Sequence, residues 1–302
     1  MSEAVSGSKL SAPIDLLRVR ALFSRPQRVQ EMDFLRREIA ARMHERLELV
    51  RITPARVLDA GCGAGADLTR LSQHFPGARI IGLDAAPAML KTAQPLSRMA
   101  ALNQLLGKLM PVASVCGDFA ALPIPANALD LVWSNLALHW HPQPDLVFAE
   151  WRRVLRAEGL LMFSCFGPDT FKELKAAFAE AGLAASALPF VDMHDFGDML
   201  VNAGFATPVL DMETITVTYA TSAALLQDVR ACGGNPLATR ARGLTGQASW
   251  QRMLLALEKF RRPDGKLALS FEIIYGHAFR PVARTTSTGE AIIRFDLPRK
   301  AK

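Results

Sequence analysis

VLDAGCGAGA, residues 57–66, sets the pattern from which the rest of the chain can be read. An apolar run leads into glycines at three alternate positions, Gly61, Gly63 and Gly65, and a helix-forming segment follows. This order predicts a short buried strand, a tight turn and a helix whose free N–H groups face the turn. Glycine also leaves room for a ligand to approach the backbone closely.

The same alternation of strand and helix continues in both directions. Strands are predicted at residues 55–61, 78–84, 112–118, 128–135 and 160–166, with helices at 66–75, 86–97 and 144–159 between them. A helix with one apolar face is predicted at residues 28–49, formed by Met32, Leu35, Ile39, Met43 and Leu47. Alternation of this kind is typical of a doubly wound parallel sheet covered by helices on both faces.

The pattern changes after Gly167. Residues 168–182 and 191–205 are predicted to be helices, 207–219 and 266–279 to be strands, and 221–262 to be largely helical. We therefore expect a Rossmann-like α/β fold with a mostly parallel seven-stranded sheet and a helical cap insertion. The predicted division is an N-terminal helical segment at 1–50, a core at 51–220 and 267–297, and a basic cap at 221–266.

Composition limits the classes of function. The chain has 302 residues, 50% of them hydrophobic, which is enough for a sizeable core. It contains no apolar run near the ~18 residues of a membrane span and no secretory signal at its start, so a cytoplasmic location without membrane insertion is expected. The four cysteines lie far apart and His139 and His141 lack further ligands, so no metal site is predicted.

The net charge of +6 is unevenly spread. Residues 1–56 hold eleven Lys and Arg against seven Asp and Glu, and residues 228–266 hold eight against three. Such faces attract an anionic partner. Because no nucleic-acid motif accompanies them and aromatic residues make up only 7% of the chain, an acidic protein or a small anion is preferred over nucleic acid.

The glycines alone leave two cofactors open. Gly61, Gly63 and Ala66 also satisfy a permissive dinucleotide pattern, and Asp84 stands where a ribose-binding acid belongs. Asp59 argues otherwise, since a carboxylate at the strand end repels a pyrophosphate and attracts a cation. Asp118 and Phe119 after the third strand offer an acceptor and a ring to a purine, and Asn135 ends the fourth strand at the expected crevice.

At this point residues 50–166 resemble the class I S-adenosylmethionine-dependent methyltransferases, whose first motif is matched by residues 57–65. The resemblance implies S-adenosyl-L-methionine as the cofactor. It implies that Asp59 and the loop flank the methionine portion, that Asp84 binds the ribose hydroxyls, and that Asp118 and Phe119 border the adenine. The predicted cofactor-binding residues are Asp59, Ala60, Gly61, Cys62, Gly63, Gly65, Asp84, Ala85, Asp118, Phe119 and Asn135.

The stretch DLVWSNLALHW at 130–140 resembles the biotin-pathway malonyl-acyl carrier protein O-methyltransferases and their relatives among respiratory complex I assembly factors. The similarity continues in FGPDTF at 166–171, GGN at 233–235, RGLTG at 242–246 and YGHA at 275–278. RGLTG in the cap favours the biotin-pathway group. The resemblance implies methylation of the free carboxylate of malonyl-acyl carrier protein in pimelate synthesis.

An ionised carboxylate attacks a sulfonium methyl without losing a proton, so no general base is required and no catalytic residue is predicted. His139 and Trp140 are candidates for the acceptor pocket. The cap arginines, Arg240 and Arg242 among them, are expected to meet the acidic carrier protein or the carboxylate.

The chain departs from the family pattern at one point. Family members commonly carry a tyrosine in the N-terminal segment, and residues 23–30 contain none, so Arg25 or Arg28 could take over anion binding. Other acceptors, such as a quinone precursor, fit the cofactor half equally well. An S-adenosylmethionine-binding assembly factor or arginine hydroxylase for complex I is a further alternative.

Overall fold

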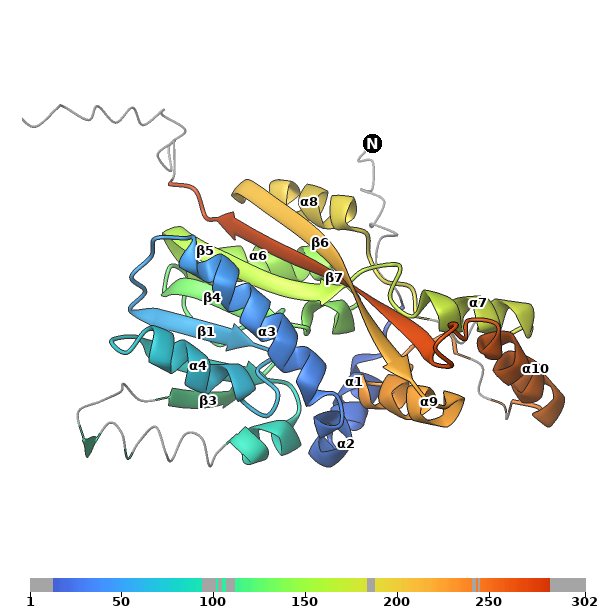
Figure 1. Ribbon diagram of the computed structural model, residues 1–302. Helices are drawn as coiled ribbons and strands as arrows, with labels where there is room; N and C mark the ends of the chain where they lie inside the picture. The colour runs from blue at the N-terminus through green and yellow to red at the C-terminus, as the bar shows by residue number, and fades with distance from the viewer. Residues whose placement is uncertain are drawn as a thin grey trace, which may run out of the picture.

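The sheet has seven strands in the order β3-β2-β1-β4-β5-β7-β6 (Figure 1). The structure is a computed structural model that describes residues 13–93, 102, 105–106, 112–183, 188–240, 243 and 245–282. All neighbours are parallel except β7, which runs antiparallel to β5 and β6, so the predicted fold class is confirmed. The strands are β1 (Arg56–Ala60), β2 (Arg79–Asp84), β3 (Val112–Cys116), β4 (Leu129–Asn135), β5 (Leu155–Phe166), β6 (Ala206–Tyr219) and β7 (Leu267–Phe279).

Helices bury both faces of this sheet. Side chains of α3 (Asp33–Glu48) and α4 (Ala66–His74) join one apolar cluster, and those of α6 (Pro144–Val154) and α8 (Met193–Asn202) join another. Neighbouring residues of one strand enter opposite clusters, as Val57 and Leu58 do on β1. Every helix among the described residues is too short or too polar to cross a membrane.

The predicted helix at 144–159 is wrong at its end. Helix α6 stops at Val154 and β5 begins directly at Leu155. Leu155 pairs with Leu129 of β4, and Arg156 Nε lies 2.5 Å from Asp130 Oδ1, so contacts distant in sequence override the local helical pattern. Glu158 has a φ of 64°, which no α-helix accepts.

The N-terminal segment forms three helices, α1 (Leu16–Phe23), α2 (Pro26–Gln30) and α3, where the sequence predicted one helix over 28–49. The carbonyl of Val29 accepts from the backbone N–H of Met32 and from Arg36 Nη1, and α3 starts anew at Asp33. The predicted apolar face is confirmed, because Met32, Leu35, Ile39, Met43 and Leu47 are all buried.

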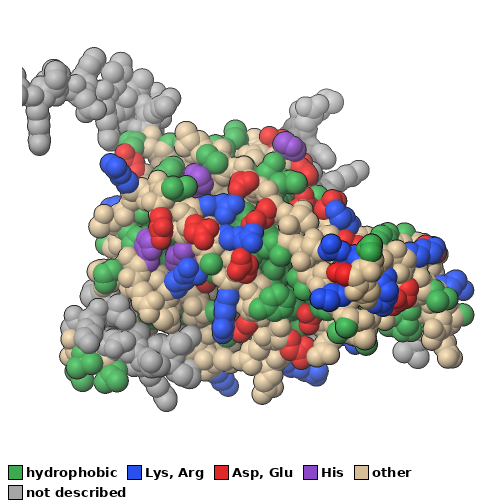
Figure 2. Space-filling model, viewed as in Figure 1, with side chains coloured by type: hydrophobic (Ala, Val, Ile, Leu, Met, Phe, Trp, Pro, Cys, Tyr) green, Lys and Arg blue, Asp and Glu red, His purple; other side chains and the backbone are tan. Residues whose placement is uncertain are grey.

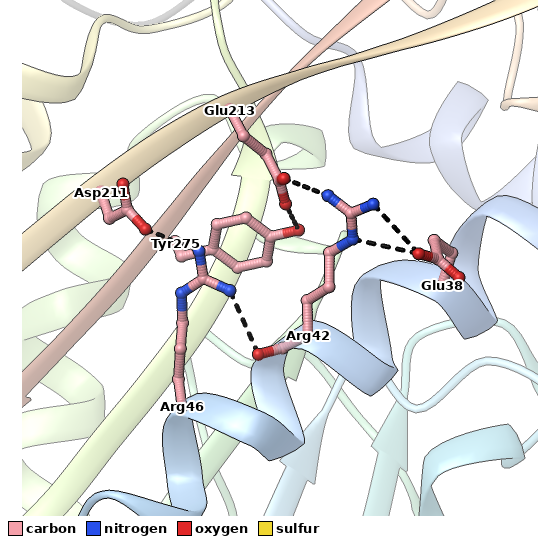
Figure 3. Close-up of polar contacts among 6 residues, drawn as sticks. All are labelled: Glu38, Arg42, Arg46, Asp211, Glu213 and Tyr275. Atoms are coloured by element: carbon pink, nitrogen blue, oxygen red, sulfur yellow. Dashed lines mark hydrogen bonds and ion pairs between the residues drawn. The ribbon is translucent and has the colours of Figure 1, made fainter.

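A group of polar side chains fixes α3 across the outer strands of the sheet (Figure 3). Glu213 of β6 pairs with Arg42 and accepts from the Tyr275 hydroxyl at 2.6 Å. Arg46 donates to Asp211 at 2.6 Å, and its guanidinium lies 3.9 Å from the centre of the Tyr275 ring. We call these five residues the α3 clamp. Charges of both signs mix on this face in Figure 2.

Helices α9 (Ser222–Ala231) and α10 (Gln247–Glu258) lie between β6 and β7 in the chain. Together with α7 (Lys172–Glu180) they lie beyond one end of the sheet (Figure 1), and Lys and Arg side chains gather there (Figure 2). The domain division remains a prediction, and residues 283–297 of the predicted core lie outside the described residues.

Candidate active site

A cavity opens at the carboxyl ends of β1, β2 and β4, where doubly wound sheets place their binding crevice. Its volume is about 1030 Å³ when its open mouth is included. Its floor consists of the glycine loop and the ends of these strands. Its roof consists of α1, α2 and the first turns of α3, which contribute Val19, Arg20, Phe23, Pro26, Val29, Gln30, Asp33, Arg36 and Arg37.

The three loop glycines are needed for different reasons. At Gly61, with φ +84°, an added Cβ would overlap the Cβ of Ala137, so the protein itself fills the space that the sequence predicted for a ligand. At Gly63, with φ +54°, no protein atom lies within 4 Å of an added Cβ. Gly65 takes the left-handed conformation, φ 81°, from which α4 starts. Gly63 therefore lies beside open space, and Gly61 does not.

Three carboxylates converge on the cavity floor. Asp59 of β1, Asp67 of α4 and Asp84 of β2 all line it. Burial raises the pKa of Asp59 well above its usual range, and the charges of Asp67 and Asp84 raise it further. Asp59 Oδ2 has no hydrogen-bond partner among the described residues. A cation in the cavity would stabilise the ionised form of all three acids.

Asp84 holds the glycine loop in shape. Its Oδ2 accepts from the Gly63 N–H at 2.9 Å and its Oδ1 accepts from the Ala86 N–H at 2.7 Å. Burial raises the pKa of this carboxyl, and these two hydrogen bonds oppose the increase. The ribose contact predicted for Asp84 stays a prediction, and it would use lone pairs that remain beside these bonds.

Asn135 connects the floor to the roof. Its Nδ2 donates to Asp67 Oδ2 at 3.0 Å and to the Arg36 carbonyl at 3.2 Å, while its Oδ1 accepts from Ser164 Oγ at 2.9 Å. Asp67 also accepts from Trp133 Nε1 at 3.1 Å. Both amide protons of Asn135 are thus used within the protein, and its side chain orients Asp67 and the start of α3.

The remaining predicted cofactor residues fall into two groups. Phe119, Cys62 and Ala85 line the cavity, with Phe119 packed 5.7 Å from the His141 ring. Asp118 and Ala60 are not among the described lining residues. Asp118 accepts from Ala120 N–H at 2.9 Å, with Arg20 Nη2 at 3.9 Å, and Ala60 is buried in the sheet, where its carbonyl accepts from Ser134 Oγ. Their contacts with a cofactor stay predictions.

The predicted acceptor residues do not all meet. Trp140, on the short helix η1 (Leu138–Trp140), lines the main cavity and packs edge-on against Phe23 at 5.6 Å. A smaller cavity adjoins the main one, and Trp140 lines it together with His139. Arg240 lies elsewhere, in a groove of the cap, and Arg242 lies outside the described residues.

Of the two arginines proposed to replace the family tyrosine, the structure places only the side chain of Arg25. Arg25 is exposed and does not line it, and the side chain of Arg28 is outside what the structure describes. Phe23 and Arg36 occupy the roof instead. Sequence reasoning missed Arg36 because nothing in α3 distinguishes it from surface arginines. It also missed Asp67, although an acid in the first turn after the glycine loop was a usable signal.

The cap groove runs between α7, α9 and α10. It is largely apolar, with Phe171, Phe178 and Trp250 in its walls, and Lys175, Arg230 and Arg240 are its basic residues. Leu188 lies in the groove and also packs in one apolar cluster with Trp140. The groove and the main cavity are therefore separated by few side chains.

Comparisons with known proteins agree with this geometry. Residues 58–163 match the family described as Methyltransferase domain. The chain is 47% identical over 283 residues to the malonyl-[acyl-carrier protein] O-methyltransferase of Gallionella capsiferriformans, covering 93% of this chain and 96% of that relative. It is 46% identical over 290 residues to the protein of that name in Laribacter hongkongensis, with the same coverage. The YcgJ protein of Bacillus subtilis has a similar fold, with a TM-score of 0.55 at 15% identity over 80% of this chain and 98% of that chain.

Proposed function

The chain belongs to the malonyl-[acyl-carrier protein] O-methyltransferase family, and from this membership we propose that it methylates the free carboxylate of a malonyl group on acyl carrier protein. The observation that carries the proposal is near-complete coverage at 47% identity. The relatives match the cap and the roof as well as the cofactor half, so the similarity includes the parts that face an acceptor. Such a reaction serves biotin synthesis.

We propose that the cavity floor binds S-adenosylmethionine, which supplies a methyl group on a sulfonium cation. Gly63 lies beside open space, so a ligand can approach the protein backbone there. The acids Asp59, Asp67 and Asp84 favour a positive charge at this place. Phe119, Ala85 and Met89 offer apolar surface to an adenine ring. The donor set of the floor thus fits a cation joined to a nucleoside.

The residues at the acceptor end match a reaction without proton transfer. Bound S-adenosylmethionine would supply its methyl group to the carboxylate oxygen, and the electron pair of the broken carbon–sulfur bond would stay on sulfur. No proton moves. Burial lowers the pKa of His139 to about 3, with the Arg36 charge acting in the same direction, so this imidazole is neutral. The protein's task is then to orient the carboxylate and to exclude water.

The carrier protein itself is proposed to meet the cap. Lys175, Arg230 and Arg240 give the groove a positive charge that complements an acidic protein. The apolar walls of the groove suit the arm on which the acyl group is carried, and Leu188 brings the groove close to Trp140.

The test is a methyl-transfer assay with the purified protein, S-adenosylmethionine labelled in its methyl group, and malonyl-acyl carrier protein. We expect label on the carrier that an esterase removes, and no label when acetyl-acyl carrier protein replaces the malonyl form. Complementation of a biotin auxotroph that lacks this activity is the matching test in cells. Absence of label on the malonyl carrier, with binding of S-adenosylhomocysteine intact, would refute the proposed acceptor.

A further inference from the structure

Arg36 lies in the wall that the main cavity shares with the smaller one. It is on the first turns of α3, directly above the cofactor floor, and 25% of its side chain is exposed. Among the described residues that line the smaller cavity, Arg36 is the one with a charged side chain. It therefore presents a positive charge to a pocket that is otherwise apolar or neutral.

The guanidinium has donors to spare. Nη1 donates to the Val29 carbonyl at 2.9 Å and to Asp33 Oδ1 at 3.1 Å. Nε and Nη2, with three N–H groups, make no hydrogen bond to any described residue. Burial lowers the pKa of Arg36 and its ion pair with Asp33 opposes this decrease, so the guanidinium remains protonated. Asp33 already pairs with this cation, and Nε and Nη2, which are not among the buried unsatisfied atoms, are free to bind a second anion in the cavity.

Two neighbours of Arg36 in the smaller cavity, His139 and Cys232, bring no negative charge against such an anion. His139 Nδ1 accepts from the Phe166 N–H at 3.4 Å, which leaves the proton on Nε2, and Nε2 has no partner among the described residues. Burial raises the pKa of the Cys232 thiol to about 12, so it carries no negative charge that could compete. Phe23 and Trp140 line both cavities beside Arg36 and give this site apolar walls.

We propose that Arg36 binds the free carboxylate of the acyl acceptor and thereby selects a malonyl over an acetyl group. The inference rests on the proposed function and names the residue that recognises its substrate. Through Nε and Nη2 the guanidinium holds the two carboxylate oxygens in parallel hydrogen bonds, and one of them presents its remaining lone pair to the floor. The tight fork of donors suits a planar carboxylate.

The test measures the Kd of malonyl- and of acetyl-acyl carrier protein by calorimetry with S-adenosylhomocysteine saturating. The wild-type protein should bind the malonyl form about 10-fold to 100-fold more tightly than the acetyl form. Arg36→Gln should bring the two Kd values close together by weakening malonyl binding alone. Equal weakening of both carriers, or an unchanged preference, would overturn the assignment.

Two variants separate recognition from support of the helices. Asp33→Asn removes the ion pair of Arg36 and frees another donor, so the malonyl preference should persist or increase; a loss matching that of Arg36→Gln would assign Arg36 to the α2–α3 junction instead. Arg36→Lys keeps the charge without the fork and should lose at least about 3-fold of the preference, even if Arg36→Gln fails to fold. An Arg36→Lys variant with full preference would also overturn the proposal. Failure of methyl transfer by the wild-type protein would refute the proposed function separately.

Discussion

The floor and the roof of the cavity are built in different ways and carry opposite charges. The floor is made by strand ends and one glycine loop, and it carries Asp59, Asp67 and Asp84. The roof is made by three helices from residues 16–48, and it carries Arg36 above the floor. The floor is rigid because sheet hydrogen bonds fix it, whereas the roof depends on how α3 is held across the sheet.

This difference suggests a division of labour. A sulfonium cation suits the acids of the floor, and a carboxylate suits the arginine of the roof. The two reactants would then be bound from opposite sides and would attract each other across the cavity. If this is correct, floor substitutions should alter cofactor binding or folding, and roof substitutions should alter acceptor preference.

The largest effect is expected from Gly61→Ala in the floor. The added Cβ would overlap Ala137, and φ +84° is unfavourable for alanine, so we expect a loss of about 3 kcal/mol or more in unfolding free energy. Urea unfolding followed by circular dichroism measures it. Gly63→Ala is the matched control, with a loss of only about 1 kcal/mol because its side is open. Equal losses would mean that Ala137 yields to the new methyl group.

Asp84→Ala should have the next largest effect, on cofactor binding. The variant loses the two hydrogen bonds that hold Gly63 and Ala86 and also the proposed contact with the ribose hydroxyls. One charge-assisted hydrogen bond to the ligand is worth about 1.5–3 kcal/mol, so affinity for S-adenosylhomocysteine should fall by about 10-fold to 100-fold. Calorimetry gives the Kd. The floor assignment would be contradicted if the affinity were unchanged in a folded variant.

Much of the floor could be predicted because its signals are local. The apolar strand, the glycines and the acids at strand ends lie within a few residues of one another, and a parallel sheet brings such ends to one edge. The five parallel strands followed from the alternation of strands and helices, and β6 and β7 were predicted from the apolar pattern of residues 207–219 and 266–279. Where prediction failed inside the core, as at Leu155, a long-range pairing with Leu129 had replaced a locally plausible helix.

The roof could not be predicted because its signals are long-range. Arg36 looks like any helix arginine until α3 is placed over the strand ends. That placement depends on β6, about 170 residues further on, and on Tyr275 of β7, which is later still. The sequence instead pointed to Arg25, which is exposed, and to Arg240, which lines the cap groove. Asp67 could be predicted in part. Its position after the glycine loop was visible in the sequence, but its hydrogen bond with Asn135 was not.

Asp59→Asn should show how much the buried charge of Asp59 lowers the free energy of unfolding when no cation is bound. Folding raises the pKa of Asp59 above that of an unfolded aspartate, about 3.9. The contribution of Asp59 to stability therefore declines as pH rises from the unfolded-state pKa to the folded-state pKa. Removing the acid should therefore raise the free energy of unfolding by about 1–2 kcal/mol near pH 7, which raises Tm by a few degrees. Near pH 4 it should change Tm hardly at all. Scanning calorimetry at both pH values measures it.

Asp59→Asn should also weaken the binding of S-adenosylmethionine more than that of S-adenosylhomocysteine, because only S-adenosylmethionine carries the sulfonium charge. Asp118→Asn, at a half-buried acid outside the lining, is the comparison for stability. A gain in Tm that persisted at pH 4 would show that charge burial is not its cause.

The smallest effect is expected from the α3 clamp, which tests whether the roof can loosen without the floor. Glu213→Gln removes the charge that pairs with Arg42, while the amide still accepts from the Tyr275 hydroxyl. Because both ion-pair partners are about 30% exposed, the loss should be about 1 kcal/mol or less, a Tm decrease of roughly 2–4 °C that shrinks in high salt. Asp211→Asn, at a carboxylate that is 57% exposed, should lower the free energy of unfolding by less still.

Affinity for S-adenosylhomocysteine should stay the same in both clamp variants, since the floor does not depend on α3 being held at this end. A parallel loss of cofactor affinity would show instead that Asn135 transmits movement of α3 to Asp67, and the floor and roof would then act as one unit.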